Sequence, residues 1–343
     1  MRGVIDIPAE LAPVGEDLAA FLDRVAGRFD DHLASELPPV RDLCHHLRGY
    51  RGKMLRPALT LLAAMTAAGR PAAELLQGDR GEDLVRIAAV CELIHMATLV
   101  HDDVLDDADI RRRTRTINRL RGNETAIILG DYLIASAYHL CSTLQDQAVA
   151  LLVAATSRTL CEGELLQLHH REDWSLDEPT YFEIIDRKTA ALISAACRLG
   201  ARAAGAGAGA EGRLAEGGRL LGIAFQIPDD LLDLTGAEGV VGKSLGKDPQ
   251  KGKCTLPVIL WLAEAQPIER GQRLGRLRQV TDPAAGPASA LAEALDRAGA
   301  LDRARQRASD LVERARALLA ASPPSPARQL MDLMARAIVE RAM

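Results

Sequence analysis

Residues 84–109 read LVRIAAVCELIHMATLVHDDVLDDAD. The part from Leu84 to Leu105 is apolar on nearly all faces and contains neither Gly nor Pro. An uninterrupted run of this length predicts a buried central helix, because buried strands are much shorter. The run ends in the acidic sequence HDDVLDDAD (101–109), and carboxylates at the end of an apolar segment are costly unless a counter-ion matches them.

The acidic pattern D-D-x-x-D occurs twice. Its members are Asp102, Asp103 and Asp106 in the first copy and Asp229, Asp230 and Asp233 in the second. Residues four apart share one face of a helix, so the first and last aspartate of each copy project together. Magnesium binds carboxylate oxygens and can coordinate phosphate oxygens of a substrate at the same time. One such cluster is equally compatible with a solvated helix end, but two copies after buried helices favour facing magnesium sites that receive a diphosphate.

Helical periodicity continues through most of the chain. Further helices are predicted at 126–144, 151–169, 181–200 and 213–234, and strand signals are scarce. Loops are predicted at 69–81, 200–212, 282–287 and 322–326. The chain is therefore expected to be all-α, with one domain over 1–343 and a flexible segment at 1–15.

The composition is that of an ordinary globular protein. Hydrophobic residues make up 48% of the 343 residues, and the net charge is −5. The six cysteines form no CxxC pair, which disfavours a zinc cluster or a disulfide framework. The N-terminus has no signal-peptide pattern, and no stretch approaches the roughly 18 apolar residues without interruption that a membrane span needs. A cytoplasmic protein with at most peripheral membrane contact is expected.

Basic residues follow each acidic cluster. In IRRRTRTINRLRG (110–122), Arg111 and Arg112 come soon enough after Asp102 to hold a diphosphate in a bidentate manner. The other arginines of this segment are expected at the surface: Arg113, Arg115, Arg119 and Arg121. A nucleic-acid patch is the alternative, but the acidic net charge and the lack of interleaved aromatics weigh against it.

Lysine is rare in this chain, and its few copies are clustered. Only six of 42 basic residues are Lys, and four of these lie within 243–253. The sequence GKSLGKDPQKGKC there offers glycines and point charges for phosphate oxygens, but it does not satisfy the Walker pattern. Upstream, RGKMLRP (51–57) carries Lys53 and Arg56. His95 falls on the helix face of Asp102, although a lone buried histidine is more often a core residue.

Taken together, these motifs resemble those of the trans-isoprenyl (polyprenyl) diphosphate synthases. The resemblance spans about 35–260 and comprises GK..RP, H-(x6)-DDxxD, a following RR, GD at 130–131, KTA at 188–190, FQIPDDLLD and GK..G.D...GK.TLP. It implies an isoprenoid-synthase-type bundle of long helices around a deep central cavity, usually as a homodimer. Two positions depart from the common GGKRLRP, namely Arg51 and Met54, and Arg113 replaces the glycine of RRG.

The resemblance also implies roles for individual residues. Asp102, Asp106, Asp229 and Asp233 resemble the ligands of magnesium, three ions per site with diphosphate bound, and Asp103 and Asp230 belong to the same clusters. Lys53, Arg56, His95 and Arg112 resemble the isopentenyl-diphosphate contacts, and Arg111 the allylic-diphosphate contact. Lys188, Lys243 and Lys253 match lysines that hold the departing diphosphate, and Thr189 and Gln226 match polar groups near the developing cation.

The implied reaction is ionisation of an allylic diphosphate, attack by isopentenyl diphosphate and loss of a proton. Residues before Asp102 are expected to line the cavity and to limit product length: Ala97, Thr98, Ile94 and Cys91. No aromatic residue lies between Cys91 and Asp102, so we predict a product longer than geranylgeranyl, from hexaprenyl to decaprenyl. Farnesyl or geranylgeranyl diphosphate is the expected starter. Tyr132 or Tyr138 is the alternative plug for the cavity.

Several other functions are compatible with part of these motifs. A geranylgeranyl or farnesyl diphosphate synthase shares the chemistry but has a shorter cavity. A terpene cyclase would not need basic motifs for a second diphosphate. A non-catalytic helical subunit of a heteromeric synthase is expected to lack one aspartate cluster, whereas both are complete here. The sequence does not specify the exact product, the starter, the pathway or the need for a second subunit.

Overall fold

The computed structural model of the protein describes residues 7–112, 114–235, 247–280 and 289–340. In this part of the chain all regular structure is helical except one short hairpin, which confirms the all-α prediction. The chain divides into two compact units, and four helices, α8, α11, α17 and α18, run from one unit into the other without a break. The prediction of a single domain stays a prediction.

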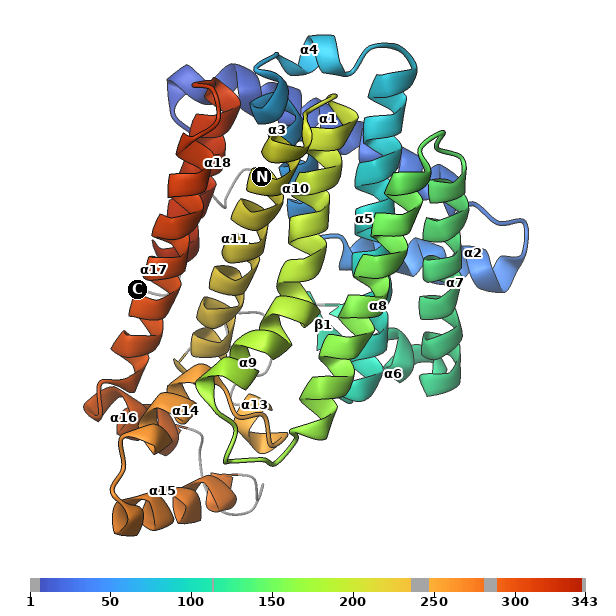
Figure 1. The fold of residues 1–343 in the computed structure, drawn as a ribbon. Helices are drawn as coiled ribbons and strands as arrows, with labels where there is room; N and C mark the ends of the chain where they lie inside the picture. The colour runs from blue at the N-terminus through green and yellow to red at the C-terminus, as the bar shows by residue number, and fades with distance from the viewer. Residues whose placement is uncertain (1–6, 113, 236–246, 281–288, 341–343) are drawn as a thin grey trace. The chain divides into compact units, whose positions relative to one another are not determined.

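The first unit comprises Met1–Arg158, Leu192–Gly218 and Arg316–Met334. Its leading elements, shown in Figure 1, are η1 (Ala9–Leu11), α1 (Ala12–His32), α2 (Pro38–Leu47), η2 (Arg48–Tyr50), α3 (Leu55–Ala68), α4 (Ala72–Leu75), α5 (Gly78–Leu105), α6 (Ile117–Arg121) and α7 (Asn123–Ser142). The beginning of α8 (Gln147–His169) and most of α10 (Ala191–Ala203) also belong to it.

Helix α5 is the centre of the first unit. It packs against α1, α3 and α7, and its side chains at Leu93, Met96 and Ala97 are 0% exposed. Its length and composition would suffice to cross a membrane, but 72% of its most apolar window is buried inside the protein, as in a core helix. The helix begins earlier than predicted, at Gly78, and α4 lies within the predicted loop 69–81, so that loop prediction was wrong for these residues.

A two-stranded hairpin follows α5 directly. Strand β1 (Ile110–Arg111) pairs antiparallel with β2 (Thr114–Arg115), with Ile110 opposite Arg115 and Arg111 opposite Thr114. Arg112 in the turn has a φ of 49°, the left-handed region that hairpin turns require. Two strands of this size are too short for the alternating pattern that would reveal them in a sequence.

The second unit comprises Thr159–Ala191, Arg219–Ala315 and Ala335–Met343. It contains the end of α8, then α9 (Glu178–Ile185), the π-helical segment η3 (Asp186–Ala190), the end of α11 (Ala208–Thr235), α13 (Lys247–Gln250), α14 (Leu256–Ala263), α15 (Pro267–Val280), α16 (Ser289–Arg297) and most of α17 (Ala300–Ala320); α18 (Pro326–Glu340) ends in it. Asp177 caps α9, because its carboxylate accepts a hydrogen bond from the backbone N–H of Thr180 at 2.9 Å.

Most predicted helices agree with the structure to within five residues at each end. The ranges 126–144, 151–169 and 213–234 correspond to α7, α8 and α11. The range 181–200 is not one regular helix, because the π-helical segment separates α9 from α10. The loop predicted at 200–212 is shorter in the structure, where only residues 204–207 separate α10 from α11. The loop predicted at 282–287 lies outside the described residues. All six cysteines are free, and four are buried.

Candidate active site

The first aspartate cluster lies at the C-terminal end of α5. Leu105 is the last helical residue and Asp106 caps the helix, with its N–H donating to the carbonyl of Asp102 at 2.8 Å. The C-terminal end of a helix carries partial negative charge, so each carboxylate there is unfavourable by about 0.3–1 kcal/mol. The fold thus concentrates aspartates where the backbone itself repels them, which is an arrangement that a bound cation would stabilise.

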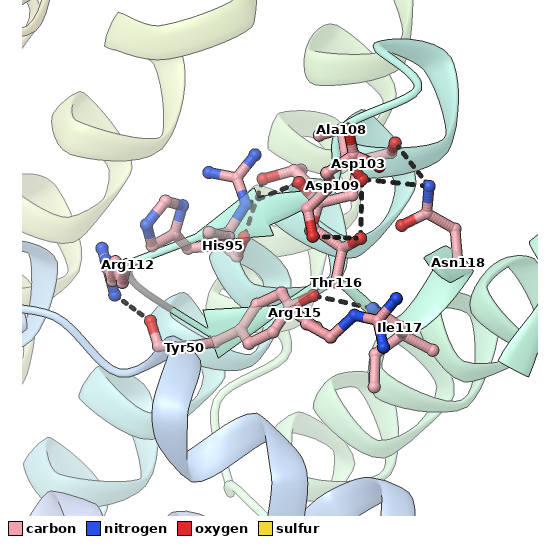
Figure 2. A network of polar contacts seen from close by, with 12 residues as sticks. Tyr50, His95, Asp103, Ala108, Asp109, Arg112, Arg115, Thr116, Ile117 and Asn118 are labelled. Atoms are coloured by element: carbon pink, nitrogen blue, oxygen red, sulfur yellow. Dashed lines mark hydrogen bonds and ion pairs between the residues drawn. The ribbon is translucent and has the colours of Figure 1, made fainter. Parts of the chain in front are cut away.

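Asp103 is the most buried member of this cluster and binds an arginine. Only 1% of the residue is exposed, and its Oδ1 accepts a hydrogen bond from Arg111 Nε at 2.7 Å (Figure 2). Among the described residues, no group donates a hydrogen bond to its buried Oδ2. Burial raises the pKa of Asp103 above its ordinary value, and Arg111 opposes this effect. One oxygen is therefore held by a cation of the protein, and the other is buried, with the Tyr50 hydroxyl close to the carboxylate.

The hairpin carries Arg111 and Arg112 to different partners. Arg111 binds Asp103, whereas the guanidinium of Arg112 donates to the carbonyl of Tyr50 (Figure 2). A Cβ at Gly52 would collide with the Arg112 guanidinium, so the glycine of the GK..RP motif is required for this close approach. Arg115 and Arg119 are exposed, as predicted for the outer arginines, and Arg113 lies outside the described residues.

The same network fixes the hairpin to its surroundings. The Tyr50 hydroxyl accepts a hydrogen bond from the N–H of Ile117 at 3.0 Å, and burial with the nearby Asp103 raises the Tyr50 pKa, so the phenol stays neutral. Thr116 Oγ1 donates to the carbonyl of Ala108 at 2.6 Å (Figure 2). Asn118 Nδ2 donates to the carbonyl of Asp103 at 3.2 Å. These neutral contacts hold the charged residues in place.

Three arginine side chains lie near His95, which is itself half-buried. Burial, reinforced by the charges of Arg56, Arg112 and Arg111, holds the pKa of His95 well below its usual value, so the imidazole is neutral near pH 7. Glu92, one turn earlier on α5, is 2% exposed and lies near Arg56, Arg112 and Arg51. Arg56 Nε and Glu92 Oε2 have no hydrogen-bond partner within the described chain. The structure thus brings together three of the four predicted isopentenyl-diphosphate contacts, and adds Glu92.

Sequence reasoning missed Glu92, although its presence in an otherwise apolar run was a signal. Lys53, the fourth predicted contact, lies in the loop before α3 and is exposed. Arg51 replaces a glycine of the common motif, and its side chain turns toward α1. It stacks over the ring of Phe29, 4.7 Å from the centroid, and donates to Asp30. Met54, the other departure, has a φ of 47° immediately before α3.

The predicted chain-length residues lie along the buried part of α5. Cys91, Ile94 and Ala97 are at most 3% exposed, and the Thr98 hydroxyl donates to the carbonyl of His95 at 2.8 Å. None of them therefore adds an unsatisfied polar group. Burial raises the pKa of the Cys91 thiol to about 12, so the thiol is neutral. Tyr138, one suggested plug, is 40% exposed on α7.

The second aspartate cluster lies near the C-terminal end of α11. Asp230 and Asp233 are 6% and 2% exposed. Asp230 accepts hydrogen bonds from Tyr181 Oη at 2.7 Å and from Gln226 Nε2 at 2.8 Å, and burial raises its pKa. Pro228 lies within this helix and has no backbone N–H, so it cannot donate the usual helical hydrogen bond to the carbonyl of residue 224. Like the first cluster, this one places buried carboxylates at a helix end, but the side chains that donate to Asp230 are neutral.

Asp248 and Tyr181 extend the second cluster and were not predicted. The N–H of Asp248, on α13, donates to Asp233 Oδ2 at 2.9 Å, and the Asp248 carboxylate lies 3.6 Å from Lys253 Nζ. The signal for Asp248 was its place in the GK..G.D...GK motif. Lys253 is thus brought to the second cluster, as predicted, and Lys243 lies outside the described residues.

Lys188 and Thr189 lie on the π-helical segment. Lys188 Nζ is 2.5 Å from Glu164 of α8, and Thr189 Oγ1 donates to Gln226 Oε1 at 2.9 Å. Gln226 in turn donates to Asp230, so Thr189, Gln226 and Asp230 form one chain of hydrogen bonds. The predicted residues Thr189 and Gln226 are therefore brought together with the second aspartate cluster.

The donor set fits magnesium better than a metal that prefers nitrogen or sulfur. It consists of carboxylate oxygens, one of them buried and without a donor in the described structure. In this part of the chain no three His, Cys, Asp or Glu side chains converge enough to hold a metal alone. Magnesium matches such a partial site, because it keeps several waters and takes further oxygens from phosphates.

Comparison with known families assigns the chain. The model of the Polyprenyl synthetase family matches residues 38–288. The chain belongs to this family. It is therefore a prenyltransferase, as the motifs predicted, and the matched range contains both aspartate clusters.

Individual relatives of this prenyltransferase are similar over nearly their whole lengths. Heptaprenyl diphosphate synthase component 2 of Geobacillus stearothermophilus is 36% identical over 330 residues, which are 96% of this chain and 97% of the relative. The crystal structure of a decaprenyl diphosphate synthase from Rhodobacter capsulatus matches with a TM-score of 0.86 at 34% identity, over 97% of this chain and 99% of that one. A polyprenyl synthase from Caulobacter crescentus CB15, complexed with calcium and isoprenyl diphosphate, matches with a TM-score of 0.86 at 32% identity and full coverage of both chains.

Proposed function

We propose that the protein is a magnesium-dependent trans-polyprenyl diphosphate synthase that adds isopentenyl diphosphate repeatedly to an allylic diphosphate. The observation that carries this proposal is the Asp103–Arg111 pair at the end of α5, which places a fixed positive charge beside the first aspartate cluster. A buried carboxylate that one arginine satisfies only in part suits a ligand that brings its own cations and anionic oxygens.

Magnesium would be held by Asp102, Asp106, Asp229 and Asp233, with three ions as the expected number. When bound, it would offset the charge of the diphosphate that leaves. The calcium and isoprenyl diphosphate bound by the Caulobacter crescentus relative support a divalent-cation site in this chain.

The basic side chains of the first unit suit isopentenyl diphosphate. Arg56, Arg112 and Lys53 supply charge, and neutral His95 supplies one N–H donor and one acceptor. Arg111 is proposed to contact the allylic diphosphate, since it already reaches the aspartate cluster. Both roles need positive charge that is fixed before the substrate arrives, and the contacts of Arg111 and Arg112 provide this.

The groups of the second unit serve the departing diphosphate and the cation. Lys188, Lys253 and Lys243 are proposed to hold the diphosphate as the allylic C–O bond breaks. The oxygens of Thr189 and Gln226 would lie near the allylic cation. The double bond of isopentenyl diphosphate then forms the new C–C bond, and the proton that is lost passes to the released diphosphate. No side chain needs to act as a nucleophile.

The product is proposed to be longer than geranylgeranyl, from hexaprenyl to decaprenyl, with a farnesyl or geranylgeranyl starter. The names of the heptaprenyl and decaprenyl relatives support this range. The absence of an aromatic side chain between Cys91 and Asp102 also supports it. A short-chain synthase is the alternative, and it would require another residue to close the cavity.

The assembly is proposed to be a homodimer in the cytoplasm, with peripheral membrane contact for product release. Exposed apolar side chains on α7 support a protein contact there, since Ile127, Ile128 and Tyr138 are 45%, 66% and 40% exposed. The name of the Geobacillus relative, component 2, supports a second kind of subunit as the alternative. Light scattering of the purified chain distinguishes a dimer from a monomer that awaits its partner.

The deciding experiment is a product assay with purified protein, magnesium, labelled isopentenyl diphosphate and a panel of allylic starters. We expect magnesium-dependent chains of six to ten isoprene units, consistent with the range above. Asp229→Ala should abolish turnover without unfolding the protein. Absence of any extended product from the pure chain, with activity only after a second subunit is added, would favour the heteromeric alternative.

A further inference from the structure

The π-helical segment η3 (Asp186–Ala190) is tied to its surroundings by four consecutive side chains. The contacts are Asp186 with Arg219 at 2.9 Å, Arg187 with Glu162 at 2.8 Å and with Glu183 at 2.9 Å, Lys188 with Glu164 at 2.5 Å, and Thr189 with Gln226 at 2.9 Å. All of these residues belong to the second unit. π-Helical turns are rare and occur frequently at functional sites. The side-chain contacts of this turn therefore indicate that its position matters for function.

The backbone of this segment lies close to α8 at Gly163. A Cβ at Gly163 would lie 2.6 Å from the backbone N of Lys188 and 2.8 Å from Arg187 Cβ. Any side chain there would have to push the π-helical segment away. Glu162 and Glu164 flank this glycine, and each pairs with one of the two basic residues opposite. Residues 162–164 therefore complement Arg187 and Lys188 both in charge, through the two glutamates, and in shape, through the glycine between them.

We infer that Glu164 is a positioning residue that acts through Lys188, and that Gly163 sets the position of the segment that carries Lys188 and Thr189. This inference rests on the proposed function, because it assigns the purpose of the positioning to the diphosphate contact of Lys188. The ammonium has three N–H donors, so it can keep Glu164 and still donate to a phosphate oxygen.

The physical need for such a residue follows from the lysine side chain. A free lysine side chain samples many rotamers, and this freedom is lost when the ammonium is fixed. The side chains of Lys188 and Glu164 are only 19% and 21% exposed, so water screens their attraction less than at an open surface. The pair therefore fixes the ammonium before substrate binds, as preorganised electrostatic stabilisation requires.

Glu162 offers a matched control on the same helix. It is 44% exposed, and its partner Arg187 also has Glu183, so loss of its charge leaves Arg187 bound. We expect Glu164→Gln to lower the single-turnover rate of the first condensation about tenfold, with the KM for isopentenyl diphosphate unchanged. Glu162→Gln should stay within about twofold of the unaltered protein on both measures.

A double-mutant cycle separates positioning from a general loss of structure. In a Lys188→Gln background, Glu164→Gln should change the rate by less than about twofold, because the residue through which it acts is gone. A full tenfold effect in that background would overturn the inference. An unchanged rate for Glu164→Gln alone would also overturn the inference. The proposed function would not be affected by that result, because it depends on elongation by the unaltered protein.

The glycine gives an independent test. Gly163→Ala should slow the first condensation at least as much as Glu164→Gln, since it displaces the whole segment. Gly212→Ala is the control, because its added Cβ would meet no atom within 4 Å. Normal condensation by a folded Gly163→Ala protein would remove the positional part of the inference.

Discussion

Substitution of Ala97 by Phe tests how the protein sets product length. Ala97 is 0% exposed on α5 and lies five residues before Asp102, or about 7.5 Å along the helix axis at 1.5 Å per residue. Cys91, the deepest predicted lining residue, lies about 16.5 Å before Asp102. A phenyl ring at Ala97 should therefore remove about half of the length available to the product. The main product should shorten to geranylgeranyl or farnesyl diphosphate.

The same substitution would have a different effect if Ala97 were packed only against protein. Overpacking a filled core costs about 1–3 kcal/mol of unfolding free energy without a defined change of product. The assay is chromatography of labelled products beside the urea dependence of unfolding. Ala89→Phe is the control, because Ala89 is equally buried but lies about 19.5 Å before Asp102 along the helix, beyond Cys91. An unchanged product distribution for Ala97→Phe, or equal shortening by Ala89→Phe, would refute the reasoning.

Three further predictions concern the first unit. Asp102→Ala should lower kcat more than about 100-fold with unchanged circular dichroism, and substantial residual turnover would contradict the metal assignment. Gly52→Ala should displace Arg112 and raise the KM for isopentenyl diphosphate about tenfold, whereas Gly27→Ala, with no atom within 4 Å of its Cβ, should leave it unchanged. Burial lowers the pKa of His95 in the folded protein, so the unfolded chain binds a proton on this histidine at a higher pH than the folded protein does. The free energy of unfolding therefore falls as the pH drops below about 6.5. His95→Gln should reduce that fall by up to about 1.4 kcal/mol per pH unit in urea titrations, and an identical pH dependence would contradict it.

Prediction from sequence worked best where the signal was local. The buried helix before Asp102, the two aspartate clusters and the outer arginines follow from spacing and composition over a few residues. The 3.6-residue period and the i, i+4 rule act within one helix, so they can be read from the chain alone. The roles given to Arg111 and Thr189 came from the resemblance of motifs and not from geometry, and they stay predictions.

Prediction failed where a residue depends on a distant partner. Nothing near Glu164 in the sequence indicates that it pairs with Lys188, and nothing near Gly52 indicates that Arg112 lies against it. The role of Asp248 depends on Asp233, fifteen residues earlier, through a backbone N–H that any residue type could supply. Arg51 was noticed as a departure from a motif, but its stacking on Phe29 required the structure.

The sequence by itself determined that this protein is helical and that it carries two acidic helix ends, and it predicted a chemistry of diphosphates and magnesium. These properties reside in single segments, where the residue types alone specify charge and periodicity. Only the tertiary structure shows which oxygen of Asp103 binds Arg111 and that a side chain at position 163 would collide with Arg187 and Lys188. It also shows that a π-helical segment follows α9. Those features arise from contacts between segments far apart in the chain, and such contacts exist only after the helices have packed.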